Sequence, residues 1–194
     1  MNQRAISKAE TERRILAAAE RFFLEAPYPQ VRIEDIAAAA EVSAPTVIHR
    51  FGSKEALMVA TISAAAERVR KQRGEAPVGD LAGAVANLIE HYELWGDSVM
   101  HLLSQEAAVP VIREATDAGR ALHVEWVERT FAPWLSDLGD ACQKRLAQLV
   151  ALMDVYVWKV LRRDRGLNKA ETENAIREMV AALLQTPSWT EVAR

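Results

Sequence analysis

Residues 42–58, VSAPTVIHRFGSKEALM, decide the fold that we expect for this chain. Ser43 is a favourable N-cap for a short helix, and Gly52 is the residue type that ends one. Ser53 then supplies the cap of a longer helix over 54–73. The stretch therefore predicts a helix of only two turns that is joined directly to a longer one.

Two further helices are expected before this stretch. SKAE at residues 7–10 reads as a capping box that starts a helix, and the prolines of APYPQ at 26–30 end it. IEDIAAAA predicts a second helix over about 33–40, and EVS turns the chain into the helix that ends at Phe51. A longer helix that packs behind two short helices and a tight turn is a helix-turn-helix.

In a helix-turn-helix the second short helix enters the DNA major groove, which is about 12 Å wide. Val42, Val47 and Phe51 are spaced as its apolar anchors. The side chains between the anchors then face outward or sideways: Ala44, Pro45, Thr46, Ile48, His49 and Arg50. Lys54 is placed to meet a DNA phosphate.

TERRILAAAERFF followed by IEDIAAAAEVSAPTVIHRFGSKEALMVA resembles the N-terminal DNA-binding domain of the TetR family of bacterial transcriptional regulators. The resemblance covers about residues 8–62. It implies an all-α fold with an N-terminal three-helix helix-turn-helix domain and a C-terminal helical bundle, about nine helices in total. The implied domains are a DNA-binding domain (1–53) and a ligand-binding and dimerisation domain (54–194), connected by the helix 54–73.

The resemblance also implies the roles of individual residues. Thr46 and Lys54 match phosphate-contacting positions, while Ala44, Pro45 and His49 match positions near base edges. Arg4 and Lys8 either help to neutralise the DNA backbone or are simply solvated. The expected DNA-binding residues are Arg32, Ser43, Ala44, Pro45, Thr46, Ile48, His49, Arg50 and Lys54.

Three positions depart from the family pattern. Glu41 stands where the family usually has glycine, so a turn with positive φ would be strained here. Ile48 replaces a common tyrosine, losing a hydroxyl contact but able to lie against a thymine methyl group. Arg32 replaces a capping Ser or Thr and can contact phosphate instead. These changes bear on operator sequence and affinity.

Composition agrees with a helical protein of one or two small domains. Of 194 residues 50% are apolar, and there are only 8 Gly and 7 Pro. The single cysteine, Cys142, excludes an internal disulfide. We find no signal peptide and no apolar run long enough to span a membrane, so we expect a cytoplasmic protein.

Charge is distributed unevenly along the chain. The net charge is −3, but residues 1–75 hold 12 Lys and Arg against 10 Asp and Glu, whereas residues 76–194 hold 12 against 17. A small DNA-binding domain needs a local basic face and not a high overall pI.

Further helices are expected over 79–96, 98–109, 111–138, 141–164 and 168–186. The last two are more apolar than one buried stripe requires, which predicts a homodimer interface; the alternative is that both simply face the monomer core. A dimer places two recognition helices about 34 Å apart, as a palindromic operator on double-stranded DNA requires.

The middle of the chain is rich in aromatic and histidine side chains, and all five tryptophans lie beyond residue 90. Such side chains are core residues more often than ligand walls, but several together suit a cavity for an apolar or aromatic small-molecule effector. The expected ligand-binding residues are Tyr92, Trp95, Met100, His101, His123, Trp126, Phe131, Met153 and Tyr156.

The pattern predicts a repressor that an effector releases from DNA, with the helix 54–73 transmitting the change. An activator of the same fold and a helical protein–protein interaction module are the alternatives. We find no catalytic motif, no metal-ligand spacing and no cofactor site, so we expect neither an enzyme nor a cofactor.

Overall fold

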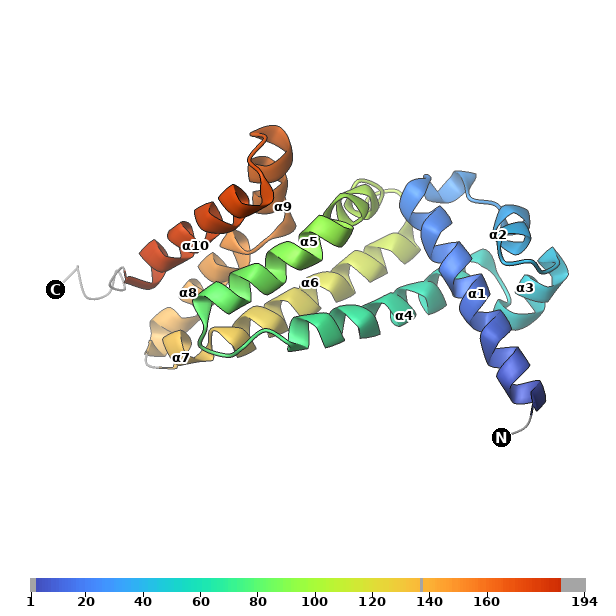
Figure 1. Ribbon diagram of the computed structural model, residues 1–194, viewed down its shortest axis with the longest axis horizontal. Coiled ribbons are helices and arrows are strands. Elements are labelled where there is room, and N and C mark those ends of the chain that lie inside the picture. Colours follow the sequence, from blue (N-terminus) through green and yellow to red (C-terminus); the bar gives the residue numbers. More distant parts are fainter. Residues whose placement is uncertain (1–2, 137, 186–194) are drawn as a thin grey trace. The chain divides into compact units, whose positions relative to one another are not determined.

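The computed structural model describes residues 3–136 and 138–185, and all regular structure in these residues is helical (Figure 1). The prediction of an all-α chain is confirmed. The elements are α1 (Gln3–Glu25), η1 (Tyr28–Gln30), α2 (Ile33–Ala39), α3 (Ala44–Phe51), α4 (Lys54–Gly74), α5 (Leu81–Leu103), α6 (Pro110–Thr130), α7 (Ala132–Leu135), η2 (Gly139–Ala141), α8 (Cys142–Leu152), α9 (Val155–Lys159), the π-helical η3 (Val160–Asp164) and α10 (Lys169–Gln185).

The helices form two compact units. Of the described residues, the first unit contains 3–68 and 98–118, and the second contains 69–97, 119–136 and 138–185. Helices α4, α5 and α6 contribute residues to both. The functional boundary between residues 53 and 54 stays a prediction, because compact units record packing and not activity.

One apolar core holds the first unit together. Ile15 and Phe23 of α1, Ile36 of α2, Val47 of α3 and Ile112 of α6 are each no more than 2% exposed. Burying a side chain of this size contributes about 1.5–3 kcal/mol. The two short helices are therefore fixed by apolar packing.

Polar contacts connect the helices of the second unit. The Glu93 carboxylate of α5 accepts hydrogen bonds from Trp158 Nε1 (3.1 Å) and Arg162 Nε (2.9 Å). The Arg145 guanidinium of α8 donates to the Leu183 carbonyl of α10. The first two contacts join α9 and η3 to α5, and the third joins α8 to α10.

The predicted break after residue 96 is wrong, since α5 runs without interruption from Leu81 to Leu103. A Cβ atom on Gly96 would lie 2.4 Å from the Trp158 ring. This glycine is needed for the close approach of an indole and does not end a helix.

Two other predicted helices are interrupted. The helix expected over 141–164 ends at Leu152, where Asp154 caps α9 by accepting a hydrogen bond from the Tyr156 amide (2.9 Å). The helix expected over 111–138 ends at Thr130, and α7 follows it. In both places a new helix begins within a few residues, which apolar periodicity alone does not reveal.

The starts of α10 and α1 are capped differently. Asn168 and Glu171 at the start of α10 bond reciprocally, each side chain accepting from the other's amide (3.0 and 2.8 Å). The box at Ser7 is wrong, because α1 already begins at Gln3. Residue 186, the expected end of the last helix, lies outside the described residues.

Candidate nucleic-acid interface

Helix α3 is closed at both ends by its own sequence. Ser43 Oγ accepts a hydrogen bond from the Thr46 amide (3.3 Å) and lies 2.8 Å from Thr46 Oγ1. At the other end Gly52 has φ 85° and its amide bonds to the Ile48 carbonyl. The helix occupies Ala44–Phe51, as the sequence predicts.

The two faces of α3 differ sharply. Val47 is fully buried, and Val42, Ala44 and Phe51 pack against the same core while partly exposed. The opposite face presents Ser43, Pro45, Ile48 and His49 to solvent. Ala44, expected to face outward, is half-buried because its methyl group meets the core.

The turn between α2 and α3 is strained at Glu41. Its φ is 54°, and it is the one non-glycine residue with positive φ in the described part of the chain. The Arg14 Nη1 atom donates to its carboxylate at 2.9 Å. The turn does adopt the positive φ at which a residue other than glycine is strained.

Lys54 has a structural contact that the sequence does not show. Its ammonium group donates to the carbonyls of Tyr28 (2.7 Å) and Val31 (2.9 Å) and lies 4.3 Å from the Tyr28 ring centre. An ammonium group has three donors. Lys54 thus fixes η1 against α4 and retains one N–H for another acceptor.

A shallow groove of about 540 Å³ lies between α1 and α3, lined by Lys8, Glu12, Pro45, Thr46, His49 and Arg50. Arg50 Nη1 donates to the Lys8 carbonyl (3.1 Å) and lies 4.0 Å from the Glu12 carboxylate. Arg50 is therefore held toward α1, with its side chain only 18% exposed. The side chain of Arg4 lies outside the described residues.

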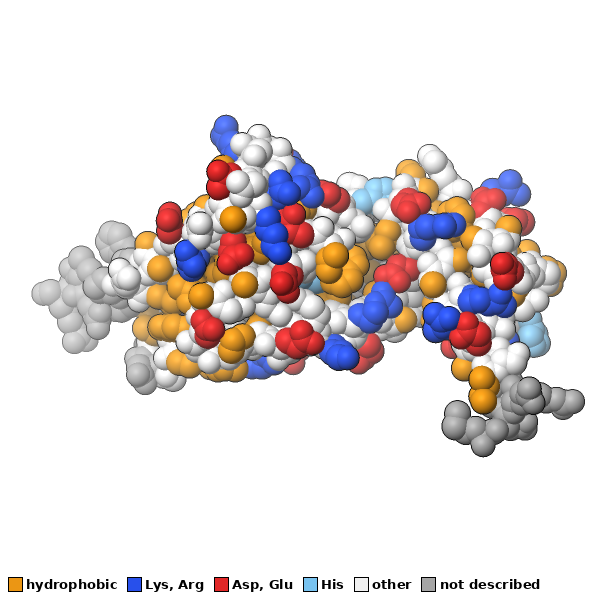
Figure 2. Space-filling view, in the orientation of Figure 1, with side chains coloured by type: hydrophobic (Ala, Val, Ile, Leu, Met, Phe, Trp, Pro, Cys, Tyr) orange, Lys and Arg blue, Asp and Glu red, His pale blue; other side chains and the backbone are white. Residues whose placement is uncertain are grey.

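Arg32 is the N-cap residue of α2 but supplies no side-chain cap. Its guanidinium is 68% exposed and lies 3.5 Å from the Glu34 carboxylate. Figure 2 shows acidic and basic side chains next to one another over the first unit, so no large single-sign patch covers this face.

The sequence model for bacterial regulatory proteins of the TetR family matches residues 15–61, which include α2, α3 and the turn between them. The chain carries a TetR-family DNA-binding domain. The protein is thus a DNA-binding regulator of transcription. No curated protein matches its sequence significantly.

Solved structures of regulators share this fold. A transcriptional regulator from Rhodococcus sp. Rha1 is 17% identical with a TM-score of 0.70, and the match covers 90% of this chain and 96% of that one. A putative TetR-family regulator from Rhodococcus sp. is 14% identical with a TM-score of 0.67, covering 91% and 100%. A putative regulator from Saccharomonospora viridis, solved in complex with choline, is 19% identical with a TM-score of 0.57, covering 89% and 96%.

The structure does not gather all the predicted ligand-binding residues in one compact unit. Met100 and His101 belong to the first unit, where His101 Nε2 lies 3.1 Å from the Ala26 carbonyl. Tyr156 belongs to the second unit but is 52% exposed. The nine residues therefore belong to two compact units, and their role in ligand binding stays a prediction.

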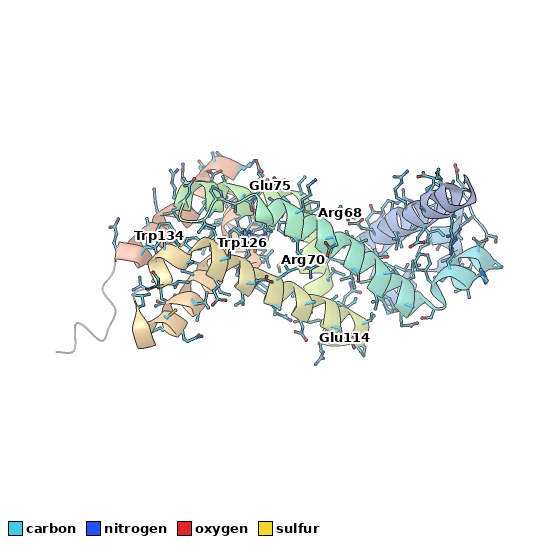
Figure 3. All side chains as sticks on the ribbon, turned by 90° about the horizontal axis from the view of Figure 1, so that it is seen from below. Arg68, Arg70, Glu75, Glu114, Trp126 and Trp134 are labelled. Atoms are coloured by element: carbon cyan, nitrogen blue, oxygen red, sulfur yellow. The ribbon has the colours of Figure 1, made fainter. Side chains whose placement is uncertain are left out.

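Seven of the predicted residues lie in the second unit, and all of these except Tyr156 are buried or half-buried. Tyr92, Trp126, Phe131 and Met153 are buried, whereas Trp95 and His123 are half-buried. The Tyr92 hydroxyl donates to the Met153 carbonyl (3.0 Å), and the His123 ring is stacked on Trp126 at 6.1 Å. Trp126 on α6 and Trp134 on α7 are labelled in Figure 3.

Arg73 was not among the residues predicted from sequence to bind a ligand, but it lies among these aromatic side chains. Its guanidinium carbon lies 4.5 Å from the Trp126 ring centre and 5.4 Å from that of Tyr92, and the residue is 6% exposed. Arg73 stands in a charged segment that is poor in large apolar residues, so the local sequence gives no sign of its burial. Helical spacing does place Arg73 on the inward-facing stripe of α4, where Met58, Thr61 and Arg73 are buried and Ala65 and Val69 are half-buried.

Burial also changes the protonation of nearby histidines. Burial and the Arg73 charge lower the pKa of His91 to about 3 and that of His123 to about 4. Both rings are therefore neutral at pH 7. The ring atoms His91 Nδ1 and His123 Nδ1 are buried without a hydrogen-bond partner.

The described residues contain no group of three or more side chains that could hold a metal ion. No helix within residues 3–136 or 138–185 is long and apolar enough to cross a membrane.

Proposed function

We propose that this regulator is a repressor that binds a palindromic operator as a homodimer and is released by a small-molecule effector. The observation that carries the proposal is the two-faced helix α3. Val47 anchors it from behind, and Pro45, Ile48 and His49 are free to meet base edges.

Contacts with the DNA backbone follow from the surroundings of α3. Lys54 retains one N–H for a phosphate, and Thr46 lies at the start of the helix, where amide groups favour an anion. Arg32 is exposed and reaches outward from α2. Arg50 is held by α1, so we assign it to the edge of the interface.

Dimerisation through the helices expected at 141–164 and 168–186 would place two copies of α3 on one face of the duplex. Leu149, Met153 and Ile176 are buried within the chain, but Tyr156 is 52% and Val160 is 46% exposed. Figure 2 shows apolar side chains gathered over the part of the second unit that includes α7 and α8. A symmetric contact would cover such surface.

The effector would act through a coupled equilibrium. A ligand that binds better to the arrangement unsuited to DNA weakens operator binding, and DNA weakens ligand binding by the same factor. Helix α4 has residues in both units, so we propose it as the transmitting element. The regulator of the same fold that was solved with choline supports a small molecule as the effector. Because its target is DNA, we propose that the protein acts in the cytoplasm.

Selection of bound duplexes from a random pool tests the proposal. We expect a palindromic motif with half-sites about one helical turn apart. An asymmetric motif would contradict the dimer, and no enriched motif would contradict sequence-specific binding.

The salt dependence of binding separates DNA recognition from the alternative of a protein-interaction module. Lys54→Ala should reduce the slope of log K against log salt by about one unit. Lys71→Ala removes the same charge from the exposed surface of α4 in the second unit and should leave the slope unchanged. Binding that ignores both salt and sequence would favour the interaction module. Reporter expression with and without the protein distinguishes a repressor from an activator.

A further inference from the structure

The second unit contains a buried positive charge without a matching negative charge. Arg73 is 6% exposed and its Nη1 atom has no hydrogen-bond partner. Arginine stays protonated in proteins, so the residue cannot escape the cost of burial by losing its proton. An unpaired ion inside a protein costs several kcal/mol.

Aromatic rings offset only part of this cost. Trp126 and Tyr92 present their rings 4.5 and 5.4 Å from the Arg73 guanidinium carbon. A desolvated cation–π contact is worth about 2 kcal/mol. Burial lowers the pKa of Arg73, and Tyr92 is the one group that acts against this; no carboxylate among the described residues does so. Within residues 3–136 and 138–185, the Arg73 guanidinium is therefore not paired with a carboxylate.

The backbone of Arg73 is fixed in place. Its carbonyl accepts hydrogen bonds from Trp126 Nε1 (2.9 Å) and Arg129 Nη2 (3.0 Å) of α6. One residue earlier, Gln72 and Asn87 of α5 exchange side-chain-to-backbone bonds of 2.9 and 2.7 Å. The guanidinium is therefore presented by a rigid support, as a binding group needs to be.

Other polar atoms near Arg73 are also without partners. His91 Nδ1 and His123 Nδ1 are buried and unbonded, as is Thr130 Oγ1 in the same unit. His123 Nε2 lies 3.2 Å from the Val150 carbonyl, so in the neutral ring its proton is on Nε2 and Nδ1 is an acceptor. Buried polar atoms without partners in a native protein need an explanation, and a ligand supplies one.

We infer that Arg73, Tyr92 and Trp126 form a binding site for a small organic carboxylate with an aromatic or apolar body. One carboxylate oxygen accepts a hydrogen bond from Arg73 Nη1, and the body of the ligand lies among the aromatic side chains. A monoanion neutralises the one buried guanidinium, whereas a phosphate dianion would bring in a second negative charge, since the neighbouring histidines are neutral and Arg129, which donates to the Arg73 carbonyl, is exposed to solvent. This inference rests on the proposed function, and it specifies that the effector carries a carboxylate.

Matched pairs of acids and primary amides test the site by isothermal titration calorimetry on the full chain at pH 7.5. The probes are benzoate, phenylacetate, 3-phenylpropionate and octanoate, each with its amide, and phenyl phosphate. We expect at least one acid to bind about ten- to a hundredfold more tightly than its amide, since a hydrogen bond to a charged group contributes about 1.5–3 kcal/mol. If no acid binds more tightly than its amide, the inference is overturned; tighter binding of phenyl phosphate would overturn the choice of carboxylate.

Arg73→Met removes the charge and keeps a long side chain. We expect it to abolish the preference for acid over amide without lowering the Tm, because an unpaired buried charge is removed. Arg70→Met, an exposed change on the same helix (Figure 3), should leave the preference intact. An Arg73→Met protein that melts at lower temperature and keeps the acid preference would show a purely structural role.

Operator binding separates this inference from the proposed function. If an acid binds through Arg73 but leaves operator affinity unchanged, the site stands and its role as effector site fails. If the ligand-free protein selects no operator, the DNA-binding proposal fails while the calorimetric result on Arg73 is unaffected.

Discussion

Replacing Glu41 by glycine and by alanine measures the strain in the turn of the helix-turn-helix. At φ 54° a side chain costs about 1–2 kcal/mol relative to glycine. Glycine also lowers the free energy of unfolding by about 0.4–1 kcal/mol, because it increases the conformational entropy of the unfolded chain. We therefore expect Glu41→Gly to be more stable than Glu41→Ala by about 0.5–1 kcal/mol.

Both variants lose the Arg14–Glu41 contact of 2.9 Å, so the ion pair cancels from the comparison. Glu41→Gln isolates the ion pair itself. The Glu41 side chain is 82% exposed, which limits that contribution to about 0–1 kcal/mol. Comparison of Glu41→Gln with the wild type gives its value directly.

Urea unfolding followed by circular dichroism at 222 nm provides the measurement, with the three variants and the wild type sharing one m value. An alanine variant that is as stable as the glycine variant would refute the reasoning. It would mean that the backbone at position 41 relaxes out of positive φ.

Three other changes have definite expected results. Gly96→Ala should destabilise the protein by about 1–3 kcal/mol in thermal unfolding, because its Cβ would lie 2.4 Å from the Trp158 ring; an unchanged Tm would show that the ring moves freely. The folded-state pKa values of His91 and His123, about 3 and about 4, lie below the unfolded value of about 6.5, so the unfolded chain binds more protons in acid. The contribution of each histidine should be almost fully present above pH 7 and fall by about 2 kcal/mol between pH 7 and pH 5. His91→Gln with His123→Gln should flatten that curve in urea titrations at several pH values. Ser43→Ala should weaken operator binding in fluorescence anisotropy and cost about 1 kcal/mol of stability, whereas Ser43→Asp should preserve the cap; equal stability of the alanine and aspartate variants would contradict the role of the cap.

The DNA-binding half of the chain could be predicted from sequence because its signals are local. Ser43, Gly52 and Ser53 define helix ends within a few residues, and Val47 is buried as its spacing predicts. The positive φ of Glu41 could also be expected, since the family has glycine there.

The second unit could not be predicted to the same depth, because its decisive contacts join residues far apart in the chain. From the local sequence Gly96 is expected to end a helix. Its actual role, to make room for the ring of Trp158, depends on a residue 62 positions later in the chain. The local sequence around Arg73 is charged and indicates exposure to solvent. Its burial depends on the rings of Tyr92 and Trp126, which come from two other helices. Neither partner is defined by the local sequence.

The position of the tryptophans has a practical consequence for experiments. Trp95, Trp126, Trp134 and Trp158 all belong to the second unit, and residues 1–68 contain none. Intrinsic emission excited at 295 nm therefore reports on the second unit and is silent about the helix-turn-helix. A fluorescent dye attached near α3 would supply a separate signal for the helix-turn-helix. Binding of an effector to the second unit and of DNA to α3 could then be followed separately in one sample.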